Sequence, residues 1–92
     1  MNIQLKNVLA DMADLENRLK RDIRQIEKDF GKAQHKLKTF KLLAQDLKFG
    51  RYYLGHVKAE RASIRRLQQH KIRCKSRLLE IEKHISALRR SA

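Results

Sequence analysis

Residues 57 to 88 read VKAERASIRRLQQHKIRCKSRLLEIEKHISAL, and the spacing of apolar residues in this stretch decides the fold class. The pattern repeats every seven residues, with one row at Val57, Ile64, Lys71, Leu78 and Ile85 and another at Leu67, Cys74, Ile81 and Leu88. Two such rows form a stripe along one face of an α-helix and are typical of helices that pair side by side. We therefore predict a helix over about residues 56 to 90.

The N-terminal half carries a similar pattern. Its first row consists of Leu5, Met12, Leu19, Ile26, Ala33, Phe40 and Leu47. Its second row begins at Val8 and Leu15 and then moves by one position to Ile23, Phe30, Leu37 and Ala44. These rows predict a long helix over about residues 3 to 48, with Asn2 as its N-cap. Gly31 interrupts the pattern without changing its phase, which favours a mild bend over a break.

Residues 49 to 55, FGRYYLG, break the period and hold two of the three glycines of the chain. They predict a turn in which Gly50 ends the first helix. We thus expect an all-α protein, a single helical domain over residues 1–92 built as a long antiparallel helical hairpin or a small helical bundle. Two helices alone bury little core, so either the first helix folds back near Gly31 or two hairpins pair as a dimer. The pattern leaves both arrangements open.

The charge of the chain is strongly positive and unevenly distributed. Lysine and arginine number 23 against 10 acidic residues, which gives a net charge of +13. Residues 1 to 46 hold ten basic and seven acidic residues, whereas residues 47 to 92 hold thirteen and three. No acid lies between Glu60 and Glu80, and a shorter acid-free stretch separates Asp29 from Asp46. An antiparallel hairpin would bring these two stretches together, and such a surface is expected to bind an acidic partner.

The candidate binding residues are selected cations of these stretches, together with two cations and two tyrosines in or beside the predicted turn. They are Arg61, Arg65, Arg66, Arg73, Lys75, Arg77, Lys41, Lys48, Arg51, Tyr52 and Tyr53. Aromatic rings beside cations form platforms on which single-stranded bases stack. Aromatic residues at the end of a hairpin also cap the core between helices, so both roles stay open for Tyr52 and Tyr53.

Catalytic and metal-binding patterns are weak in this sequence. His70 and Cys74 share a helix face, but no further ligand pair stands at a suitable spacing, and Cys74 falls in an apolar row. We therefore predict that Cys74 is a buried core residue and that the protein is no enzyme and needs neither cofactor nor metal. The lone cysteine and the lack of a signal peptide or a long apolar run favour the cytoplasm.

A family resemblance starts from the second predicted helix, where Arg73-Cys74 is followed by Leu78, Ile81-Glu82, Ile85, Leu88 and Arg90. This series resembles the C-terminal helix of the primosomal replication protein N'' (PriC) family. The first helix adds residues 14 to 19, DLENRL, which are similar to an upstream stretch of that family. The resemblance covers about half of the chain and implies a role in replication restart. It also implies binding to single-stranded DNA, to the acidic tail of single-stranded DNA-binding protein and to the replicative helicase. Members of the family are nearly twice as long.

The sequence is compatible with two functions. The first is a basic binding module for nucleic acid or an acidic replication partner. The second is a coiled-coil adaptor or structural protein that pairs with another helical protein. Phosphate contacts make affinity fall steeply with salt, whereas apolar helix pairing is nearly indifferent to it. We expect no membrane partner, because the apolar stripe is narrow and the chain has no tryptophan.

Overall fold

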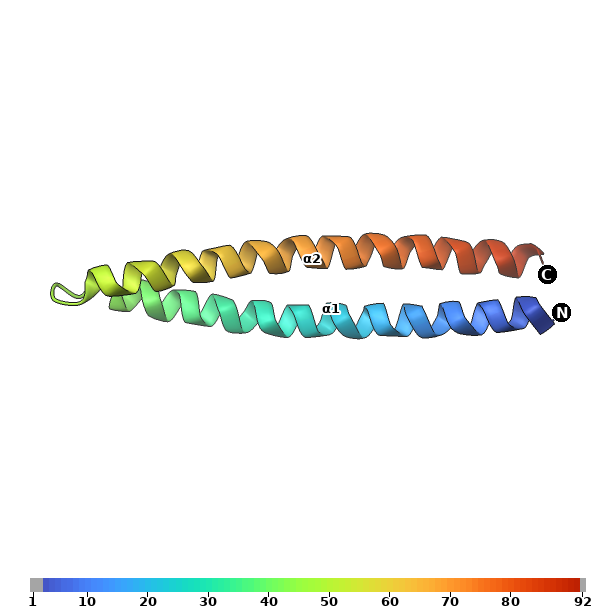
Figure 1. Ribbon diagram of the computed structural model, residues 1–92, viewed down its shortest axis with the longest axis horizontal. Coiled ribbons are helices and arrows are strands. Elements are labelled where there is room, and N and C mark those ends of the chain that lie inside the picture. Colours follow the sequence, from blue (N-terminus) through green and yellow to red (C-terminus); the bar gives the residue numbers. More distant parts are fainter. Residues whose placement is uncertain (1–2, 92) are drawn as a thin grey trace. The chain divides into compact units, whose positions relative to one another are not determined.

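The protein consists of two long helices that pack as an antiparallel hairpin (Figure 1). The structure, a computed structural model, describes residues 3 to 91. Helix α1 runs over Ile3–Leu43 and helix α2 over Gly50–Ser91. No strand occurs among the described residues. The all-α prediction is confirmed, and the predicted N-cap Asn2 lies outside the described residues.

The chain divides into two compact units, and each unit contains a segment of both helices. The connection between the helices belongs to the second unit. Unit 1 comprises residues 1–25 and 72–92, and unit 2 comprises residues 26–71. In unit 1 the side chains of Leu19, Ile23, Cys74 and Ile85 are buried. Ile26, Ala33 and Val57 form the corresponding buried core of unit 2.

The predicted rows of α2 lie on its inner face, since every member is buried or half-buried. The second row of α1 was predicted wrongly at its start. Val8 and Leu15 are each 46% exposed, and the inner positions are Leu9 and Glu16 instead. The row therefore keeps a constant seven-residue phase through Ile23, with the carboxylate of Glu16 at one of its positions. An apolar side chain on a helix surface is common enough that its presence alone does not show burial.

The connection between the helices covers residues 44–49. The predicted turn at 49–55, the predicted end of the first helix at 48 and the predicted start of the second at 56 are therefore each five or six residues too late. Asp46 Oδ1 accepts hydrogen bonds from the backbone N–H of Lys48 at 2.7 Å and of Phe49 at 2.9 Å. These bonds satisfy amides that have no helical partner at the start of a helix. The cap at Asp46 thus starts α2 early, and residues 50 to 55 become helical.

Gly50 begins α2 and does not end α1. Its N–H donates to the carbonyl oxygen of Asp46 at 2.9 Å. The residue is buried, and a Cβ at this position would lie 2.5 Å from the carbonyl oxygen of Ala44. Glycine is therefore needed here for close approach of two backbone segments.

Helix α1 continues through Gly31 without a break. A Cβ on Gly31 would meet no atom within 4 Å. Because α1 is continuous across Gly31, the first helix does not fold back there, and the three-helix arrangement is excluded.

Candidate binding surfaces

The arginine side chains predicted to bind an acidic partner point into solvent in both units. Arg61, Arg65 and Arg66 belong to unit 2, and Arg73, Lys75 and Arg77 belong to unit 1. All six residues are exposed. Arg66 donates a hydrogen bond to Ser63 Oγ at 3.2 Å. The two ion pairs found within residues 3–91 join Lys20 to Glu16 and Lys71 to Glu27, so these six cations keep their charge available.

Unit 2 is the more basic unit. By sequence it carries twelve cations against four acids, a net charge of +8, whereas unit 1 carries eleven against six, a net charge of +5. Lys32 and Lys36 of α1 line a hollow of about 280 Å³ together with Ser63 and Leu67 of α2. The two acid-poor stretches are therefore neighbours, as predicted. Asp29 and Glu60, which bound these stretches, line the same hollow.

The hairpin tip, defined here as residues 41–54, contains the remaining predicted cations Lys41, Lys48 and Arg51, all of which are exposed. Its one acid is Asp46. The backbone hydrogen bonds from Phe49 and Lys48 lower the pKa of the Asp46 carboxyl below its ordinary value, because they stabilise the charged form. The ammonium of Lys48 stands 5.6 Å from the ring centroid of Phe49.

The two tyrosines of the tip differ in their surroundings. The half-buried Tyr53 ring stacks on Phe40 with centroids 6.3 Å apart. Phe40 also stacks on His56, at 4.7 Å and an interplanar angle of 16°. Tyr53 therefore caps the core between the helices. Tyr52 contacts Tyr53 edge-on at 5.2 Å and is 67% exposed, so its outer face is open to a ligand.

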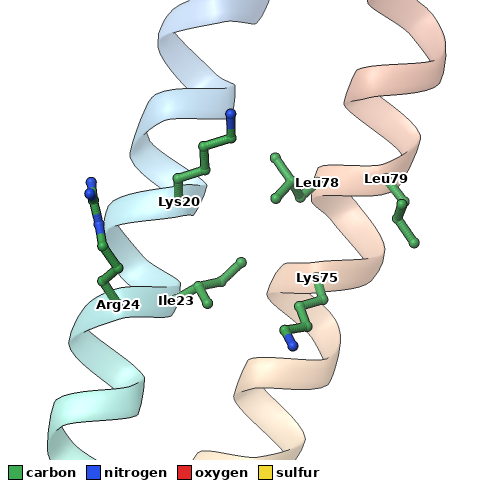
Figure 2. A pocket seen from close by; sticks show the side chains of 6 residues that line it. All are labelled: Lys20, Ile23, Arg24, Lys75, Leu78 and Leu79. Atoms are coloured by element: carbon green, nitrogen blue, oxygen red, sulfur yellow. The ribbon is translucent and has the colours of Figure 1, made fainter.

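An apolar groove in unit 1 was not predicted from the sequence. It has a volume of about 530 Å³ and is lined by Lys20, Ile23, Arg24, Lys75, Leu78 and Leu79. Figure 2 shows Ile23 of α1 and Leu78 of α2 directed toward each other, while Arg24 extends along the outer side of α1. Leu79 lies outside the seven-residue rows and is 59% exposed. The adjacent pair Leu78-Leu79 could have indicated this groove from the sequence. Only one of two consecutive helical residues can face the other helix, so the second must be exposed beside it.

The prediction for Cys74 is confirmed, since its side chain is 6% exposed in the core of unit 1. His70, four residues earlier, is exposed. Within residues 3–91, no group of three or more His, Cys, Asp or Glu side chains is arranged to hold a metal ion.

Comparison with known proteins gives no relative: no family model, curated protein or solved structure matches the chain. Neither helix of the described residues combines the length and the apolarity that crossing a membrane requires.

Proposed function

We propose that this chain is a non-enzymatic, basic binding protein of the cytoplasm that binds single-stranded DNA and acidic protein segments during replication restart. Its partners are then single-stranded DNA, the acidic tail of single-stranded DNA-binding protein and the replicative helicase, as the family resemblance implies. The observation that carries the proposal is the run of exposed cations on α2, uninterrupted by acid between Glu60 and Glu80.

The exposed arginines suit phosphate binding for two reasons. A guanidinium group donates hydrogen bonds in a planar fork that matches phosphate and carboxylate oxygens. Within residues 3–91, neither Arg65 nor Arg66 has a carboxylate partner that would have to be displaced first. Neutralised phosphates release counterions, which drives binding at low salt.

The groove of unit 1 supports the acidic protein segment as a partner. Its floor is apolar, at Ile23 and Leu78, while Lys20, Arg24 and Lys75 stand around it and no acid lines it. An apolar side chain flanked by carboxylates would bury its carbon atoms in the groove and pair its charges with the surrounding cations. A negatively charged tail with apolar residues has this chemistry.

The experiment is a salt series of binding to labelled single-stranded DNA by the wild type and by the Arg65→Glu, Arg66→Glu double variant. We expect the double variant to lose at least about tenfold in affinity and to show a shallower dependence on salt, by roughly 0.7 for each lost phosphate contact. Helicity should be unchanged, because both side chains point away from the seam.

The matched control is Arg89→Glu with Arg90→Glu, which makes the same change of charge on the same helix. Both residues are exposed and belong to unit 1. If the two double variants lose affinity equally, the net charge of the chain and not the arginine run governs binding. Unchanged affinity in the Arg65 and Arg66 variant at low salt would contradict the proposal.

A coiled-coil adaptor is the second candidate, and the groove also favours it. Leu79 and Ile72, one heptad apart on α2, are 59% and 67% exposed, so an apolar ridge borders the groove. Pairing of a partner helix along this ridge would depend little on salt. Salt-insensitive binding of a helical partner, lost on Ile72→Ser with Leu79→Ser, would favour the adaptor.

A further inference from the structure

Exposed apolar side chains are concentrated at the hairpin tip. Eleven large apolar residues are exposed among those described, and six of them fall within residues 42–54. The six are Leu42, Leu43, Leu47, Phe49, Tyr52 and Leu54. Thirteen consecutive residues thus hold more than half of the exposed large apolar residues that the structure describes. Exposed apolar side chains gathered in one short segment mark a site of interaction.

These side chains stand outside the core and do not complete it. Leu47 lies in the connection and is fully exposed, and Leu42 at the end of α1 is 64% exposed. The core of this region is already closed by the stacked rings of Phe40, Tyr53 and His56. The exposed leucines could therefore be buried only by contact with another molecule or with a membrane.

The charge around these side chains selects an anionic partner. Lys41, Lys48 and Arg51 are exposed within the tip, and Lys38 and Lys58 flank it. Asp46 is the one acid between Asp29 and Glu60, and its Oδ1 is already bound to two backbone amides. A second copy of the chain would bring like charges together at this surface, which opposes dimerisation through the tip.

Four of the six exposed apolar side chains of the tip are leucines, which favours a lipid surface over nucleic acid. Bases stack on aromatic rings, and Leu42, Leu47 and Leu54 offer none. Leucine, tyrosine and phenylalanine beside lysine and arginine form the composition that inserts at a bilayer interface, with the apolar groups among acyl chains and the cations among anionic headgroups. The patch is formed by a turn and two helix ends, which allows shallow insertion and requires no spanning segment.

We propose that the hairpin tip docks onto the surface of an anionic lipid bilayer through Leu42, Leu47, Phe49, Tyr52 and Leu54, with Lys41, Lys48 and Arg51 on the headgroups. The narrow apolar stripe of the helices was the reason to expect no membrane partner. Leu47 was predicted to belong to that stripe, but it lies in the connection and is fully exposed.

The absence of tryptophan from the chain makes a direct test possible. Leu47→Trp places a single fluorescent reporter in the connection, and Gln69→Trp places one at an exposed polar position of unit 2 as a control. With vesicles of phosphatidylcholine and phosphatidylglycerol, we expect the emission of the Leu47→Trp variant to shift to shorter wavelength and that of the control to stay unchanged. Vesicles of phosphatidylcholine alone should give a much smaller shift, and salt should weaken the effect on anionic vesicles.

Sedimentation with the same vesicles measures the contribution of the apolar residues without tryptophan. Leu47→Ser with Phe49→Ser should lower partitioning by at least about tenfold, because two large apolar side chains no longer leave water. The matched control is Val8→Ser with Leu15→Ser, which removes two exposed apolar residues from unit 1 and should change partitioning less than about twofold. Circular dichroism checks that both variants remain helical.

Three results would overturn the proposal. The first is no fluorescence shift at residue 47, or one equal for neutral and anionic vesicles. The second is an equal loss of partitioning in the two serine double variants. The third is a shift caused by a single-stranded oligonucleotide but not by vesicles, which would make the tip a nucleic-acid surface. The arginines tested under the proposed function are unchanged in all these variants, so the two proposals fail independently.

Discussion

Glu16 in unit 1 and Lys71 in unit 2 both occupy positions in the apolar rows, yet they compensate their charge differently. Glu16 pairs with Lys20 one turn further along the same helix, with 3.8 Å between the carboxylate oxygen and the ammonium nitrogen. Lys71 pairs with Glu27 of the other helix at 3.2 Å. An ion pair within one helix is indifferent to how that helix meets its neighbour, whereas an ion pair between helices is made at one register only.

The two ion pairs therefore differ in whether they can determine the pairing of the helices. Glu16 and Lys71 are both partly accessible, with 24% and 35% of their side chains exposed, so neither pair adds much stability. A charged residue at a single seam position is instead known to fix register and oligomeric state at a cost in stability. Lys71 has the partner for this role and Glu16 does not.

The largest effect is expected for Leu19→Ala in unit 1. Leu19 is 6% exposed, so the change should lower the free energy of unfolding by about 2–4 kcal/mol, as other large-to-small core changes do. Leu15→Ala is the matched control, because the same atoms are removed from a side chain that is 46% exposed. It should cost less than about 1 kcal/mol. Urea unfolding followed by circular dichroism measures both, and equal losses would mean that the row through Val8 and Leu15 faces the core after all.

A smaller loss is expected for Gly50→Ala in unit 2. The added Cβ would meet the backbone oxygen of Ala44 at 2.5 Å, and backbone cannot move aside as a flexible side chain can. We expect a loss of about 1–3 kcal/mol. Gly55→Ala, five residues further along α2, meets no atom within 4 Å and should gain about 0.5–1 kcal/mol. Thermal unfolding of the two variants should therefore shift in opposite directions.

The comparison itself is tested by Glu16→Leu and Lys71→Leu. Each change replaces a partly buried charge by an apolar side chain and should raise the free energy of unfolding by about 0.5–1.5 kcal/mol. Glu16→Leu should leave a single oligomeric state. Lys71→Leu removes the ion pair between helices and should yield a mixture of states, which light scattering after size-exclusion chromatography would detect. A single state in both variants would show that Lys71 does not specify the pairing.

The smallest effect is expected for Asp46→Asn, which keeps an acceptor for the amides of Lys48 and Phe49 but removes the charge. The pKa of Asp46 is lowered from 3.8 by these hydrogen bonds. A carboxyl whose pKa is lower in the folded state stabilises the fold above its unfolded pKa and loses that contribution as the pH falls through the folded value. The melting temperatures of variant and wild type should therefore differ slightly at neutral pH and converge below about pH 3.8. If the two melting temperatures converged at a higher pH, the difference between them would arise from a titratable group other than Asp46.

Much of the fold was predictable from the sequence, because the apolar repeat of α2 is strict from Val57 to Leu88. The start of the second row of α1 was not predictable. Val8 and Leu15 are both apolar, whereas the pair that faces the other helix, Leu9 and Glu16, contains a charged residue. Apolarity alone therefore selected the wrong pair. The turn was misplaced because Gly50 was interpreted as a helix end. Asp46 carried the missed signal, since an aspartate just before a helix is a common N-cap.

The candidate surfaces were predictable in part. Exposure of the arginines follows from their positions outside the rows, as for Arg65 and Arg66 beside Ile64. The groove depends on which residues of α1 stand opposite Lys75 and Leu79, and a repeat does not specify the register between two helices. Whether a tyrosine caps the core or faces solvent likewise depended on the true position of the connection.

The short connection at residues 44–49 also has a consequence for the order in which the contacts between the helices form during folding. Contacts beside it join residues close in sequence, such as Phe40 and His56, sixteen positions apart. Glu27 and Lys71 are forty-four positions apart, and the contacts of unit 1 join segments from the two ends of the chain. Closing a short loop costs less entropy than closing a long one. We therefore expect pairing to start at the stacked rings and to proceed toward the termini, so that the native hairpin opens from its ends and amide exchange is fastest there.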